Sequence, residues 1–89
     1  MPSDELLESW ERTRSHLARA WVELPPGDGG TDEYQDYLDH NELGLAMETL
    51  ADVGDLRGAS GAFWTALADA ASEMKLSAQA EEYEQRSRT

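Results

Sequence analysis

The chain has 89 residues, of which 19 are acidic and 7 are basic, so its formal net charge at pH 7 is −12. This length predicts one small domain, and a chain this negative is repelled by the phosphates of nucleic acids and by anionic lipid. The absence of cysteine excludes disulfides, thiolate metal sites and cysteine nucleophiles. No apolar stretch is long enough for a membrane span or a signal peptide, so we expect a cytoplasmic protein.

Apolar spacing and capping residues predict an all-α fold: a single domain over residues 1–89, built as an array of four to five helices with no sheet. Ser3 is placed to cap the first helix, because its hydroxyl can accept from the free amides of the first turn. Pro25 and Pro26 end that helix, and the glycine-rich loop at residues 25–30 is predicted to be mobile. The expected helices span residues 4–23, 32–38, 40–53, 60–75 and 78–86.

The helix boundaries in the middle of the chain depend on local capping signals. Thr31 is predicted to be the N-cap of the second helix. Asp39 with Glu42 three residues later fits a capping box, which restarts a helix at residue 40; one continuous helix through this point is the alternative. Gly44 lies inside the third helix and favours close approach of another helix, while Gly54 is placed for a left-handed helix end.

Apolar residues at helical spacing define the expected core. Ala80 and Tyr83 are the inward side of the last helix. Most aromatic residues fit core positions, but Phe63 takes a better inward position than Trp64, and an exposed Trp64 or Tyr34 would be an anchor for a partner. The residues expected to be buried are Leu17, Trp21, Leu43, Met47, Leu50, Phe63 and Leu67.

The residues that could support metal binding or catalysis form no known motif. Asp32, Asp36 and His40 are spaced by four residues, and helical carboxylate–imidazole pairs can bind a divalent ion, as could Asp36 with Asp39. No complete metal motif is present, and neither His40 nor His16 has the neighbours of a catalytic base. We therefore expect no metal, no cofactor and no catalytic site, and hence no enzyme.

The uneven distribution of charge is the main functional signal. Residues 20–56 contain no Lys or Arg but ten acidic residues, whereas the flanking segments are nearly balanced. Concentrated like charge destabilises a compact chain, so either it serves a basic partner or it is a solvated face without a partner. On the first interpretation the binding residues are Asp32, Glu33, Asp36, Asp39 and Glu42, flanked by Glu48 and Asp52.

Two segments carry a family resemblance. Residues 34–50 (YQDYLDHNELGLAMETL) join an acidic helix, a His-x-Glu element and a Gly-Leu-Ala stretch, and residues 63–71 (FWTALADAA) are rich in Ala. Over residues 32–76, about half the chain, the sequence resembles the Maf-type immunity proteins of bacterial polymorphic toxin systems and related small helical proteins of actinobacteria. The resemblance implies a helical, cytoplasmic, non-enzymatic protein that neutralises a cognate toxin by binding it.

Charge and resemblance together favour an immunity protein that places an acidic face on the basic site of a toxin. The alternative is a helical interaction or adaptor module, or a self-associating dimer, unrelated to toxins. Either way the expected partner is a basic protein or a second copy, not a nucleic acid or a membrane, and the chain is a monomer or a homodimer.

Overall fold

The computed structural model describes residues 3–88, and within that range it contains five α-helices and no strand. Helices take up more than three quarters of these residues, which confirms the predicted all-α fold without a sheet. The largest differences from the expected boundaries are at the two ends of the third helix. The helices are α1 (Asp4–Val22), α2 (Thr31–Asp39), α3 (Leu43–Arg57), α4 (Gly61–Glu73) and α5 (Ser77–Ser87).

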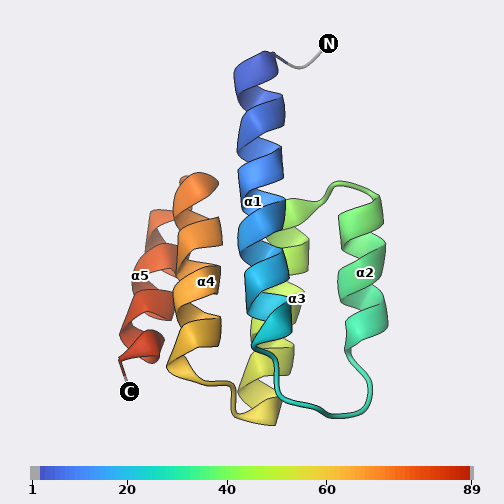
Figure 1. The fold of residues 1–89 in the computed structure, drawn as a ribbon, viewed down its shortest axis with the longest axis vertical. Coiled ribbons are helices and arrows are strands. Elements are labelled where there is room, and N and C mark those ends of the chain that lie inside the picture. Colours follow the sequence, from blue (N-terminus) through green and yellow to red (C-terminus); the bar gives the residue numbers. More distant parts are fainter. Residues whose placement is uncertain (1–2, 89) are drawn as a thin grey trace.

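The longest helix, α1, lies at the centre of the fold (Figure 1). On one side α4 packs against α1 and α5 packs against α4, while α3 lies behind α1. On the other side α2 packs against α3, its Tyr34 ring also stacks on Trp21 of α1, and no described helix covers its outer side. The N-terminal half of α1 extends beyond the other helices.

Three helix ends share one backbone pattern. Asn41, Gly58 and Lys75 each follow a helix in the left-handed conformation, with φ of 55°, 64° and 61°. The N–H of the next residue then donates to a carbonyl five residues back, as Glu42 N–H does to the oxygen of Tyr37 at 2.8 Å. This is a Schellman motif, which glycine adopts without steric cost and other residues adopt less readily.

The capping predictions around α2 are wrong. A break is present near Asp39, which excludes the continuous helix, but Asp39 is the last residue of α2 and not the N-cap of the next helix. The Schellman motif extends the turn, so α3 begins only at Leu43, and Glu42 before it makes no side-chain capping bond. Thr31 is likewise inside α2, because the left-handed Gly30 (φ 86°) occupies the N-cap position.

Neither glycine of α3 has the role predicted for it. Gly54 does not end the helix, which continues to Arg57; a Cβ at Gly54 would lie 2.3 Å from Cε1 of Phe63. Gly44 meets nothing within 4 Å, so no other element approaches it closely. The close approach of α3 and α4 is therefore at Gly54, where the Phe63 ring lies in the space of the missing side chain.

The core is close to the one expected. Trp21 is only half-buried, because its ring stacks on Tyr34 at the edge of the core, with centroids 5.2 Å apart and 15° between planes. Trp64 and Tyr34 are 5% and 2% exposed, so neither is a surface anchor. The other six predicted residues are buried, namely Leu17, Leu43, Met47, Leu50, Phe63 and Leu67.

Candidate functional site

The strongest candidate site is a set of five carboxylates on α2 and the turn after it, here called the acidic α2 surface. α2 uses Tyr34 as its buried contact and half-buries Tyr37 and Leu38. Because those three positions take one stripe of the helix, the acidic positions between them face outward. All five acidic residues are exposed: Asp32, Glu33, Asp36, Asp39 and Glu42.

Local contacts on this surface raise the pKa values of two side chains, Tyr37 and His40, of which only His40 can carry a positive charge. The Tyr37 hydroxyl donates to Oε1 of Glu33 at 3.2 Å, which raises the pKa of the tyrosine. His40 Nδ1 lies 2.8 Å from the backbone oxygen of Asp36 and 3.7 Å from its carboxylate. The backbone hydrogen bond first, and the carboxylate second, raise the pKa of His40 above its usual 6.5. His40 is therefore the titratable cation of this surface.

The described arginines other than Arg14 make their contacts away from the acidic α2 surface. Arg14 is the one that reaches the end of α2, where it donates to the backbone oxygen of Leu38 at 2.8 Å and to Oδ1 of Asn41 at 2.9 Å. Its charge there complements the negative end of the helix dipole. The ion pairs formed by the others lie on α1, α3, α4 and α5: Arg12–Glu73 at 2.7 Å, Arg19–Asp69 at 2.9 Å, Arg88–Glu84 at 2.7 Å and Arg86–Asp55.

Arg57 holds the loop that precedes α2. Its guanidinium donates to the backbone oxygen of Pro25 at 3.0 Å and to that of Gly29 at 2.9 Å. A Cβ at Gly27 would lie 2.7 Å from Nε of Arg57, so the loop passes directly over this side chain. The loop is thereby attached to the C-terminal end of α3; its mobility stays a prediction.

The two flanking residues of the predicted binding set are not part of this surface. Glu48 and Asp52 are exposed on α3, but they line a groove shared with α5 and not the outer side of α2. Nε2 of Gln79 in α5 donates to Oε1 of Glu48 at 3.2 Å, which fixes that direction. The structure thus brings together five of the seven predicted residues and separates Glu48 and Asp52 from them.

The metal candidates of the sequence do not converge. Asp32, Asp36 and His40 share α2 and the residue after it, but within residues 3–88 no group of three or more His, Asp or Glu side chains is arranged to hold a metal ion. The close contact of His40 is a backbone oxygen of its own helix, at 2.8 Å. Nδ1 of His40 is therefore occupied by a contact with the backbone of its own helix.

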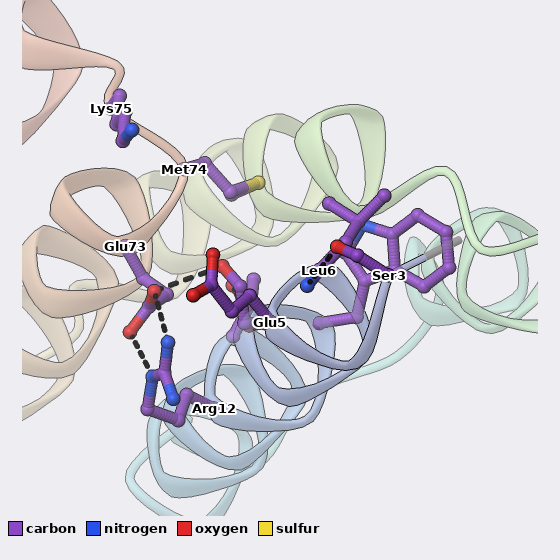
Figure 2. A pocket seen from close by; sticks show the side chains of 10 residues that line it. Ser3, Glu5, Leu6, Arg12, Glu73, Met74 and Lys75 are labelled. Atoms are coloured by element: carbon purple, nitrogen blue, oxygen red, sulfur yellow. Dashed lines mark hydrogen bonds and ion pairs between the residues drawn. The ribbon is translucent and has the colours of Figure 1, made fainter.

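A separate hollow lies away from these carboxylates, between the N-terminal half of α1 and the end of α4 (Figure 2). Its volume is about 550 Å³. Arg12 and Ser9 both donate to Glu73, at 2.7 Å and 2.9 Å, and these bonds lower the pKa of that carboxyl. Arg12, Ser9 and Glu73 therefore satisfy one another, and their hydrogen bonds link α1 to α4.

Comparisons with protein-family models, with curated proteins and with solved structures found no match to this chain. Within residues 3–88, no helix is long and apolar enough to cross a membrane. The resemblance carried by residues 34–50 and 63–71 therefore stays a prediction, and the function is argued from the side chains described above.

Proposed function

We propose that this is a non-enzymatic binding protein whose acidic α2 surface docks on clustered Arg and Lys side chains of a protein partner. The observation that carries the proposal is the segregation of charge. Five exposed carboxylates occupy one helix and its following turn, while the arginines that form ion pairs with carboxylates lie on the other helices. A solvated face that served solubility alone would be expected to mix the two signs.

Such a surface acts on the rate of association. Opposite charges attract over about one Debye length, roughly 8 Å at physiological salt, and so orient two proteins before they touch. Once they touch, a carboxylate can accept two parallel hydrogen bonds from one guanidinium, which gives the contact a direction as well as strength. The short α2, covered by no described helix on its outer side, presents these groups without a steric barrier.

The most concrete partner is a toxin domain that acts in the cytoplasm on nucleic acid. A cleft that binds phosphates carries clustered Arg and Lys, and carboxylates on a rigid helix can occupy the positions of the phosphates. The acidic α2 surface falls within residues 32–76, the part of the chain that resembles Maf-type immunity proteins. The protein would then neutralise the toxin by blocking its substrate site.

The first test is whether a neighbouring gene encodes a toxin domain, and that domain then serves as the binding partner. Association rates are measured by surface plasmon resonance for the parent, for the triple variant Asp32→Lys, Asp36→Lys, Glu42→Lys, and for a control triple variant. The control changes Glu8, Glu11 and Glu81 to Lys, which alters the net charge equally but on exposed positions of α1 and α5.

The α2 variant should associate roughly tenfold more slowly or worse, because steering acts on the on-rate. The control should keep most of the parental rate, and only the α2 variant should fail to protect cells that express the toxin. Equal rates for the two triple variants would contradict a localised docking surface. A neighbouring gene that encodes no toxin domain would contradict the immunity assignment.

A second candidate function is self-association through α1. Leu6 and Leu7 are 42% and 44% exposed on the half of α1 that extends beyond the other helices, with Trp10 half-buried beside them. Exposed apolar side chains grouped on a projecting helix favour contact with another helix. Sedimentation equilibrium distinguishes this candidate: a dimer that the double variant Leu6→Gln, Leu7→Gln converts to a monomer supports it.

A further inference from the structure

The loop between α1 and α2 contains an aspartate that is followed directly by a glycine. Asp28 and Gly29 are both exposed, and both lie outside the helices. Gly29 has a left-handed φ of 77°, and a Cβ at that position would meet nothing within 4 Å. The peptide bond between the two residues is therefore open to solvent, and its chemistry is independent of the function proposed above.

An aspartate before a glycine can rearrange without an enzyme or a cofactor. The backbone nitrogen of Gly29 attacks Cγ of Asp28, so that an N–Cγ bond forms, and the hydroxyl of the protonated carboxyl leaves with the amide proton as water. Water then opens the resulting five-membered succinimide ring at one of its two carbonyl carbons. Opening at Cγ restores aspartate, whereas opening at the α-carbonyl carbon gives isoaspartate, in which the main chain runs through the former side chain.

Glycine favours the first step because it places no side chain beside the attacking nitrogen and leaves the backbone free to turn. Every other aspartate of the chain lies in a helix and is followed by a residue that has a side chain. Helical backbone angles hold the next nitrogen in place, whereas ring closure has to bring that nitrogen to Cγ. Asp28 is therefore the aspartate at which the fold permits the reaction.

Asn41 offers a comparison within the same chain, because asparagine forms the same ring with loss of ammonia. It too lies in a turn, with φ of 55°. There, however, the N–H of Glu42 donates to the oxygen of Tyr37 at 2.8 Å, and Oδ1 of Asn41 accepts from Arg14 at 2.9 Å. Both reacting groups are thus held by hydrogen bonds, and we expect Asn41 to stay intact.

The reacting groups of the Asp28–Gly29 pair are not held in this way. The hydrogen bond that Gly29 forms within residues 3–88 is made by its carbonyl oxygen and not by its N–H. The carboxylate of Asp28 takes part in none of the ion pairs of the described chain. The attacking nitrogen and the attacked carboxyl are therefore both accessible.

Arg57 restrains this pair from a distance. Its guanidinium donates to the backbone oxygens of Pro25 and Gly29, at 3.0 Å and 2.9 Å, on either side of Asp28. Ring closure moves the nitrogen of Gly29 and so displaces the carbonyl that Arg57 holds. The isoaspartate product has one more carbon in the main chain between the two oxygens, so they no longer match one guanidinium. The two hydrogen bonds therefore oppose the rearrangement.

We propose that Asp28 is a site of spontaneous isomerisation to isoaspartate, and that Arg57 slows this reaction by holding the loop to α3. The product keeps the mass and the charge of the parent, but its free α-carboxylate makes it a substrate for carboxyl methyltransferases that recognise isoaspartate. Isomerisation also releases the loop from α3 beside the N-terminal end of α2.

The test is to age the full chain at neutral pH and physiological temperature, and to locate isoaspartate by methyltransferase labelling and electron-transfer mass spectrometry. The folded parent should accumulate isoaspartate at residue 28. Asp28→Glu should abolish it, because the larger ring closes more slowly, and Asp28→Asn should accelerate it, because ammonia is lost more readily than water. Arg57→Met keeps the length of the side chain without its donors and should accelerate it about fivefold, the effect of one ordinary hydrogen bond.

Two controls separate the loop contact from general unfolding. Asn41 and the helical aspartates should stay unmodified in folded Arg57→Met, and in urea this variant and the parent should react at equal rates, because the unfolded chain has no such contact. A folded parent without isoaspartate at residue 28, or with as much at the helical aspartates, would overturn the proposed site. Equal rates for the folded parent and folded Arg57→Met would overturn the role of Arg57.

Discussion

The two sides of the molecule use charge differently. On the side formed by α1 and α4, the ion pairs Arg12–Glu73 and Arg19–Asp69 join two helices that also share the apolar core. On the other side, α2 packs on α3 and leaves its carboxylates to solvent. Charged side chains therefore join two helices on one side of the fold and face solvent on the other, and the second side is the one proposed to bind a partner.

Packing, and not these ion pairs, stabilises the side formed by α1 and α4. The side chains of Arg12 and Arg19 are 54% and 53% accessible, and an ion pair that is open to water on its arginine side contributes little to stability, because solvent screens it. Leu67 and Leu50, by contrast, are fully buried. The comparison therefore predicts large effects from the core, moderate effects from helix contacts and small effects from surface charge.

The largest effect should come from emptying the core. Leu50→Ala or Leu67→Ala should lower the free energy of unfolding by about 2–5 kcal/mol, because each leaves a cavity where the chain is fully buried. Leu56→Ala is the matched control, since Leu56 is 88% exposed and should change stability by less than about 0.5 kcal/mol. Urea denaturation measures all three; equal midpoints would contradict the assigned core.

Substituting the two glycines of α3 by alanine should change the stability of the protein moderately and in opposite directions. Gly54→Ala forces a Cβ against the Phe63 ring, 2.3 Å away, and should destabilise the protein by about 1–3 kcal/mol, as overpacking does. Gly44→Ala meets no atom within 4 Å and should stabilise it by about 0.5–1 kcal/mol through helix propensity. Thermal unfolding followed by circular dichroism gives both signs, and the same sign for both substitutions would contradict the packing of α3 on α4.

The smallest effect concerns pH on the acidic α2 surface. The contacts with Asp36 raise the pKa of His40 in the folded state above 6.5, so their contribution to stability is complete below the unfolded value. That contribution is lost as the pH rises through the raised pKa. NMR titration of His40 should show Asp36→Asn lowering its pKa only partly, because the backbone hydrogen bond is retained; an unchanged pKa would mean that the carboxylate has no influence.

The sequence predicts those features whose causes are local. Ser3 caps α1 by accepting from the N–H of Leu6 at 3.1 Å, as its position before two acidic residues indicates. The ends of α2 and α4 are different, because Asn41 and Lys75 form the same left-handed turn as Gly58 without a glycine to signal it. The capping box at Asp39 was a plausible local pattern, but it competed with a backbone motif that the residue types do not reveal.

The candidate site is likewise predictable from the sequence only where its geometry depends on a single helix. Acidic positions between Tyr34, Tyr37 and Leu38 face solvent by helical geometry alone, so the acidic α2 surface follows from the sequence. Glu48 and Asp52 turn toward α5, which depends on how α3 and α5 both pack on α4. The separation of these two residues from the acidic α2 surface could not be predicted for that reason, because it depends on contacts between helices far apart in the sequence.

The most direct test of the account is where a basic probe binds. Titration of isotope-labelled protein with an octa-arginine peptide should shift the amides of residues 32–42 most at low salt, and these shifts should shrink as salt screens the attraction. The variant with Asp32, Asp36 and Glu42 changed to Lys should lose them, and the control variant at Glu8, Glu11 and Glu81 should keep them. Shifts spread evenly over every exposed carboxylate, or unchanged in the first variant, would contradict a docking surface on α2.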